Sequence, residues 1–158
     1  MRAAALRGTW IHRLLERLPE VPQDKRADAA HRWLEHSAGL ADAESRRQIV
    51  ELVCRVLDDA ELAPLFSERS LAEAPLAATL PDGRVIAGTV DRLLVEQERV
   101  SVLDFKTGRV PAQEADIPAS HRAQMAAYAE ALRVIFPGKT VRAALLYTAG
   151  PRLFELPS

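Results

Sequence analysis

Apolar residues in the first 66 positions recur with the spacing of amphipathic helices. A first helix is predicted after Gly8-Thr9, and Pro19 ends it because proline cannot continue the helical hydrogen bonds. Two more helices are predicted over residues 25–36 and about 43–59. In the last of these, an i, i+3, i+4, i+7, i+8 pattern places the apolar residues on one face: Ile49, Leu52, Val53, Val56 and Leu57. This part of the chain is therefore predicted to be helical and to pack on a core.

The pattern changes after Phe66 to short segments rich in Val, Ile, Leu and Thr, which are typical of strands. Three strands are predicted over residues 73–80, 84–95 and 100–106, and their short connections make them an antiparallel meander. After a loop over 107–118, a helix (119–136) and two further strands (141–148 and 153–156) are predicted. The fold class is therefore α/β, or α+β by a stricter definition: a mixed central sheet with an antiparallel meander, flanked by helices.

The length of 158 residues fits a single domain over 1–158, with a helical part at about 1–66 and the sheet and its helix at about 67–158. No apolar run approaches the ~20 residues that span a bilayer. Residues 1–6 are too short and too lightly apolar for a signal peptide, so a cytoplasmic location is expected. One cysteine, Cys54, excludes a disulfide within the chain and a cysteine-ligated zinc or iron–sulfur site.

The charge pattern limits how the chain can meet a polyanion. The net charge of −1 indicates that a local basic patch or a partner must supply most of any affinity for phosphate. The basic residues are 18 arginines and only three lysines: Lys25, Lys106 and Lys139. Because the chain uses arginine at most basic positions, each lysine is a candidate for a role that requires an ammonium group rather than a guanidinium group.

Asp104 and Lys106 are two residues apart on a predicted strand and so project from the same face. A carboxylate beside an ammonium can bind a metal and manage a nearby water, although a plain ion pair is an open alternative. Asp91 interrupts the preceding strand, and the short turn at 96–99 places it about opposite Asp104. Opposed carboxylates destabilise a sheet unless a cation lies between them, so these residues predict a divalent-metal site, with a solvated edge position as the alternative for Asp91.

Other candidates lie around this centre. Gln124 and Tyr128 are spaced i, i+4 on one helix face, where they contact a phosphate backbone or support the acids, or are ordinary surface residues. Glu73, at the start of the first predicted strand, is a candidate for a second, outer carboxylate, although an ordinary surface role is the favoured interpretation. His12, one turn into the first helix, suits a metal or a water relay, or is an ordinary surface or core histidine. His121 stays a possibility beside Gln124.

Five short motifs occur in a fixed order: Gly8-Thr9-x-x-His12, Glu73-x-Pro75, Gly88-x-x-Asp91, Asp104-Phe105-Lys106 and Gln124-x-x-x-Tyr128. Together they resemble the PD-(D/E)XK nucleases of the RecB type across nearly the whole chain, and most closely the C-terminal nuclease domains of AddA-type helicase-nucleases. The resemblance implies a restriction-endonuclease-like core. Val90 stands where many such nucleases have proline before the first acid.

The resemblance also implies a mechanism. His12, Asp91, Asp104 and the Phe105 carbonyl would hold Mg²⁺, with Mn²⁺ as a substitute. Lys106 would orient or deprotonate the attacking water or stabilise the developing charge, and hydrolysis would leave a 5′-phosphate and a 3′-hydroxyl. The implied role is an exonuclease on single-stranded DNA in double-strand-break repair by recombination.

The implied partners are a helicase in the same polypeptide and an AddB-like second subunit. No Gly-x-x-x-x-Gly-Lys motif is present, so the chain is expected to be the C-terminal fragment of a larger helicase-nuclease. Two alternatives stay open. One is a stand-alone nuclease of the same superfamily, and the other is a non-catalytic nuclease-like module for DNA binding or docking. The presence of Asp91, Asp104 and Lys106 together argues against the non-catalytic module.

Overall fold

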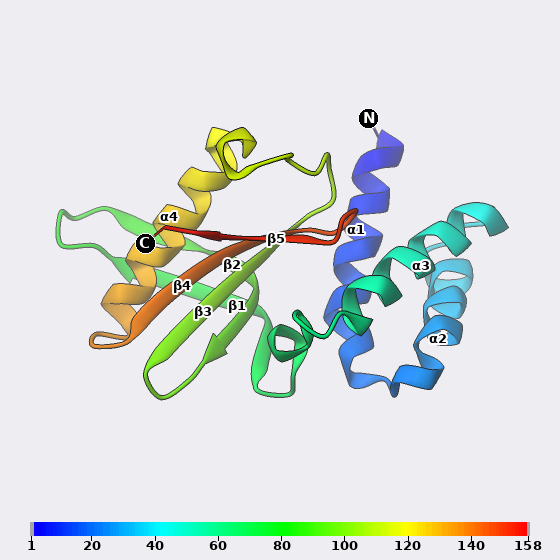
Figure 1. The fold of residues 1–158 in the computed structure, drawn as a ribbon, viewed down its shortest axis with the longest axis horizontal. Coiled ribbons are helices and arrows are strands. Elements are labelled where there is room, and N and C mark those ends of the chain that lie inside the picture. The colour runs from blue at the N-terminus through cyan, green and yellow to red at the C-terminus, as the bar shows by residue number, and fades with distance from the viewer. Residues whose placement is uncertain (1, 158) are drawn as a thin grey trace. The chain divides into compact units, whose positions relative to one another are not determined.

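A computed structural model describes residues 2–157, so Met1 and Ser158 of the predicted domain lie outside the described residues. The chain divides into two compact units with a boundary between Glu68 and Arg69 (Figure 1). The first unit is helical, and the second holds the sheet and its helix. Within residues 2–157 no helix is long and apolar enough to cross a membrane.

The helical unit contains three α-helices, α1 (Arg2–Arg17), α2 (Arg26–Arg32) and α3 (Ala43–Asp58), and both α1 and α2 pack on α3. A π-helical turn, Trp33–Ser37, extends α2, and three short 3₁₀ turns cover Leu18–Glu20, Gln23–Lys25 and Ala63–Phe66. The predicted start of the first helix is wrong, because α1 begins six residues before Gly8. Gly8 lies on the buried stripe of α1 with Ile11 and Leu15, where its small size is accommodated, and the preceding alanines favour a helix.

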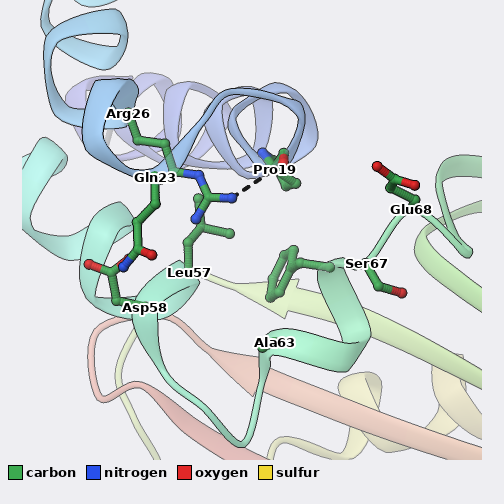
Figure 2. A pocket seen from close by; sticks show the side chains of 9 residues that line it. Pro19, Gln23, Arg26, Leu57, Asp58, Ala63, Ser67 and Glu68 are labelled. Carbon is green, nitrogen blue, oxygen red and sulfur yellow. Dashed lines mark hydrogen bonds between the residues drawn. The ribbon is translucent and has the colours of Figure 1, made fainter.

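Arginine side chains hold the connections of this unit by donating to backbone carbonyls. Arg26, the first residue of α2, donates from Nε to Leu18 (3.1 Å) and Val21 (2.9 Å) and from Nη2 to Pro19 (3.3 Å). Figure 2 shows Arg26 at the rim of a pocket of about 370 Å³, in which Gln23 bonds the Asp58 carboxylate at 3.1 Å. Arginine therefore serves in this unit as a clamp for the turn between α1 and α2.

The sheet unit contains five strands in the order β1-β2-β3-β4-β5. Their bounds are β1 Ser70–Thr79, β2 Val85–Val95, β3 Arg99–Lys106, β4 Thr140–Tyr147 and β5 Arg152–Leu156. The pairs β1–β2, β2–β3 and β4–β5 are antiparallel, whereas β3 and β4 are parallel because α4 (Ala119–Ile135) crosses between them. The predicted mixed sheet with an antiparallel meander is thereby confirmed.

Helix α4 packs across one face of the sheet and forms the core of this unit with it (Figure 1). Its buried residues alternate with exposed ones at helical spacing, and they meet the apolar side chains of the strands. The core residues on α4 are Met125, Tyr128, Ala129 and Leu132, and those on the strands include Val90, Leu93, Val100, Val102, Val141, Leu145 and Tyr147. This packing fixes α4 over the strands that carry the predicted acids.

Cations also secure the connections of the sheet unit. Lys139 donates its ammonium group to the carbonyls of Glu96 and Gln97 (2.9 Å to Gln97) in the turn between β2 and β3. Arg152 bonds the carbonyls of Pro111 and Ala112 in the loop after β3. Lysine in this arginine-rich chain is thus not reserved for chemistry, because Lys139 has a structural role.

Candidate active site

The two acids predicted to face each other do so in the structure. The pairing of β2 with β3 runs to Arg92 opposite Leu103, and the next step brings Asp91 opposite Asp104. The Asp104 side chain is 10% exposed and hydrogen-bonds the Asp91 carboxyl. Burial, followed by the hydrogen bond and the charge of Asp91, raises the pKa of Asp104 to about 7, against the opposing effect of Lys106. Two carboxylates therefore share a site that disfavours ionising both.

The backbone of Phe105 joins this pair. Its N–H donates to Asp91 Oδ2 at 2.7 Å. The Lys106 carbonyl accepts from the Thr148 N–H of the segment after β4, at 2.9 Å. Because successive residues of a strand direct their backbone groups to opposite neighbours, the Phe105 carbonyl points to the β2 side, where Asp91 lies.

Lys106 is held between a strand and a helix. Its Nζ lies 2.9 Å from Asp104 Oδ2 and donates to Gln124 Oε1 at 3.0 Å. The Gln124 amide in turn lies 3.5 Å from the Tyr128 hydroxyl. The side chain of Lys106 is 20% exposed, so the ammonium is fixed at the edge of the acid pair with limited access to water. Lys106 therefore forms the ion pair with Asp104, and the same contact keeps its ammonium group beside the two carboxylates.

Gly88 explains how Tyr128 reaches this site. A Cβ at position 88 would lie 3.0 Å from the Tyr128 hydroxyl oxygen and 3.2 Å from Cε1. The absence of a side chain on β2 at this point leaves the space that the phenol ring occupies. The residue that closely approaches the backbone of Gly88 is thus Tyr128.

The predicted outer residues have different surroundings. Glu73 does not open its strand, since β1 begins at Ser70. It is exposed, has φ +49°, and stands in the register of β1 opposite Asp91. His12 lies on α1 in the helical unit, where its Nδ1 donates to the Gly8 carbonyl at 3.0 Å. This bond places the ring proton on Nδ1, so Nε2 is the nitrogen suited to a metal. The role of His12 stays a prediction.

The sequence does not mark Tyr147 as a site residue, and it marks His121 only as a possibility. Tyr147 stands opposite Lys106 in the parallel pairing of β3 with β4, and its hydroxyl is 2.9 Å from His121 Nδ1 on the first turn of α4. The i, i+3 spacing of His121 and Gln124 was the available signal for His121. The register of β4 is set by a long crossover, so nothing local marked Tyr147.

The acid pair fits a small divalent cation. Mg²⁺ takes oxygen ligands and is commonly bound through one or two carboxylates plus water and substrate phosphate. Asp91 and Asp104 supply these oxygens, and their closeness, together with burial, opposes the ionisation of both carboxyls and raises the pKa of Asp104. Within residues 69–157 no group of three or more His, Cys, Asp and Glu side chains is gathered. The site in this unit is thus an acid pair with one lysine.

Comparison with known proteins gives one family. A profile described as the PD-(D/E)XK nuclease superfamily matches residues 1–155. The chain is 29% identical over 157 residues to a protein of Streptococcus equi subsp. zooepidemicus (strain MGCS10565) that is described as one of the subunits of an ATP-dependent helicase/nuclease. It is 26% identical over 162 residues to a protein of the same description from Listeria monocytogenes serotype 4a (strain HCC23).

These relatives are much longer than the chain. The two matches cover 92% and 89% of this chain but only 12% and 13% of the relatives, so the chain spans about one eighth of their length. A solved structure described as SSO0001 aligns with 82% of this chain and 62% of that chain, at 14% identity and a TM-score of 0.38.

Proposed function

The chain belongs to the PD-(D/E)XK nuclease superfamily, and from this premise we propose that it is a divalent-metal-dependent DNA nuclease centred on Asp91, Asp104 and Lys106. The observation that carries the proposal is the buried, opposed acid pair with Lys106 held beside it. Such a pair destabilises the fold when no cation is bound, because each carboxylate raises the free-energy cost of ionising the other. A function in binding a cation and a phosphodiester accounts for the presence of the pair.

In this proposal Asp91, Asp104 and the Phe105 carbonyl hold Mg²⁺, for which Mn²⁺ substitutes. When bound there, the cation supplies Lewis-acid polarisation of phosphate and a lowered pKa of water. Asp91 is oriented for this task by the Phe105 N–H, which fixes one carboxylate oxygen at 2.7 Å. His12 is included as a further ligand on the strength of the family resemblance.

Lys106 acts on the reacting groups. Two of its three ammonium protons are directed to Asp104 and Gln124, and the third is available to a water or a phosphate oxygen. The ammonium orients the attacking water and stabilises the charge that develops on the phosphoryl oxygens. The water oxygen bonds to phosphorus as the bond to the 3′ oxygen breaks, which leaves a 5′-phosphate and a 3′-hydroxyl.

Gln124 and Tyr128 position Lys106 from α4. Gln124 accepts from the ammonium, and Tyr128 lies beside the Gln124 amide in the space that Gly88 leaves. Because α4 is packed on the sheet core, this contact fixes the lysine side chain against a rigid element. Glu73 is proposed as an outer support of the site because its register position is opposite Asp91.

The substrate is proposed to be single-stranded DNA supplied by a helicase. The relatives are described as helicase/nuclease subunits, and the matched region is a small part of their length. The net charge of −1 agrees with a domain that receives DNA from a motor. The proposed partners are therefore a helicase in the same polypeptide and an AddB-like second subunit, in recombinational repair of double-strand breaks.

Cleavage of a labelled single-stranded oligonucleotide with Mg²⁺ or Mn²⁺ tests the proposal. We expect cutting that EDTA stops and that Asp104→Ala and Lys106→Ala abolish, with folding verified by circular dichroism. Asp116→Ala and Lys25→Ala are matched controls, since they remove an exposed acid and an exposed lysine. Absence of cutting even with the helicase and second subunit restored would reject the nuclease and favour a DNA-binding or docking module.

A further inference from the structure

His121 belongs to the same stripe of α4 as the residues that hold Lys106. Positions 121, 124 and 128 follow an i, i+3, i+7 pattern and so share one helix face. The pKa of His121 is lowered, first by partial burial and then by the charge of Lys106. The stripe thus extends the site by one turn toward the start of α4.

Tyr147 fixes the orientation of the His121 ring. The phenol is 1% exposed and packs edge-on against Phe154, with ring centroids 5.8 Å apart and an interplanar angle of 87°. Its hydroxyl lies 2.9 Å from His121 Nδ1. A buried hydroxyl needs an acceptor for its proton, and Nδ1 is the acceptor that this geometry provides. The imidazole proton is consequently on Nε2.

The Nε2–H group of His121, the outer nitrogen of the ring, is a hydrogen-bond donor that does not contribute to holding the fold. Within residues 69–157 the ring makes one hydrogen bond, the bond through Nδ1, and the residue is only partly buried. It stands in the first turn of α4, where the N–H groups of Ala119 and Ser120 precede the first helical hydrogen bonds. A helix start beside Lys106 has a positive potential that favours an anion.

We propose that His121 binds the DNA substrate, with Nε2–H donating to a non-bridging oxygen of the phosphate next to the one that is cleaved. This inference rests on the proposed nuclease function and adds a phosphate-binding residue to it. The neighbouring phosphate is the fitting target because His121 lies one turn of α4 away from Gln124, the residue that holds Lys106 at the reacting centre. Tyr147 acts through His121 as a positioning residue.

Two substitutions separate this role from a purely structural one. His121→Asn places an amide oxygen where Nδ1 stands, so the Tyr147 hydroxyl keeps its acceptor while the outer donor is lost. His121→Gln places an amide nitrogen where Nε2 stands, so the outer donor is kept while the acceptor is lost. His36→Asn, at an exposed histidine, is the matched control.

The variants are compared in the 158-residue chain by binding of a short single-stranded oligonucleotide without divalent cation, followed by fluorescence anisotropy, and by cleavage with Mg²⁺. We expect His121→Asn to weaken binding and to raise KM by about tenfold at unchanged melting temperature, the low end for a hydrogen bond to a charged group. His121→Gln should bind better than His121→Asn. Equal binding by His121→Asn and the wild type overturns the inference.

A spectroscopic measurement keeps the test independent of the variants. In ¹⁵N spectra of the wild type, His121 should show the Nε2–H tautomer, and its Nε2 signal should move when the oligonucleotide is added. An Nδ1–H tautomer, or signals that do not move, would overturn the inference even if the variants fail to fold. A wild type that does not cleave even with the helicase and second subunit restored rejects the nuclease function, while anisotropy still decides the role of His121.

Discussion

Replacing Asp104 by asparagine should abolish cleavage and at the same time make the metal-free chain more stable. Asp104 is 10% exposed and faces Asp91, so its ionisation is opposed by burial and by a second negative charge. Asparagine keeps the shape of the side chain and an oxygen for Lys106, but it carries no charge. The same substitution removes an anionic oxygen that the proposed Mg²⁺ requires.

The size of the gain follows from the pKa of Asp104. The value rises from 3.8 to about 7, a difference of about 3.2 pH units, and each unit corresponds to about 1.36 kcal/mol. The folded chain therefore keeps a proton that the unfolded chain loses between these values. The contribution of Asp104 to stability is present below pH 3.8 and is lost as pH rises through about 7. At pH 8 we expect Asp104→Asn to raise the free energy of unfolding by about 4 kcal/mol.

Urea denaturation at pH 8 in EDTA, followed by circular dichroism, measures this difference. Asp116→Asn is the control, because it makes the same isosteric change at an exposed carboxylate. Its free energy of unfolding should stay within about 0.5 kcal/mol of the wild type. An Asp104→Asn chain that is no more stable than the wild type would refute the reasoning that the two carboxylates oppose each other.

Four further outcomes follow from the same contacts. The free energy of unfolding of the metal-free wild type should fall between pH 4 and 7 in a pH series of urea titrations, and saturating Mg²⁺ should restore it at pH 8; a flat profile would contradict the pKa of Asp104. Gly88→Ala should lower the cleavage rate about tenfold by displacing Tyr128, and adding Tyr128→Phe should recover part of the loss, because the hydroxyl is the nearest atom at 3.0 Å. Gln124→Met should lower kcat more than it raises KM in steady-state assays, because methionine offers no acceptor to the Lys106 ammonium group, which Gln124 holds at 3.0 Å. An unchanged kcat would show that this contact does not contribute to catalysis. Lys139→Met should cost about 1 to 2 kcal/mol of stability in urea titrations and leave the activity of the folded chain intact, because it bonds only turn carbonyls.

The facing acids were predictable because local rules fix the hairpin that carries them. Polar residues between two apolar strands place the turn at 96–99, and counting from that turn sets Asp91 opposite Asp104. The same strand periodicity puts Asp104 and Lys106 on one face. These contacts depend on short sequence separations, so pattern alone determines them.

Contacts between distant segments were not predictable in the same way. Tyr147 meets Lys106 through a parallel pairing whose register is set by α4 and its loops, and no local pattern encodes that register. Gly8 suggested a helix boundary but lies inside α1, because a small residue on a buried stripe is tolerated where the surrounding residues favour a helix. Glu73 likewise lies within β1 at a positive φ, which the alternation of apolar residues did not indicate.

Mn²⁺ titration of the ¹⁵N-labelled chain shows whether the acid pair holds a divalent cation. Paramagnetic broadening locates the ion, so the amide signals of Asp91 and of residues 104–106 should broaden first, and excess Mg²⁺ should reverse the effect. The Asp104→Asn chain should lose this selective broadening. Broadening that begins at residues other than these and His12, no broadening in the wild type, or an identical pattern in Asp104→Asn would show that the acid pair does not hold the cation.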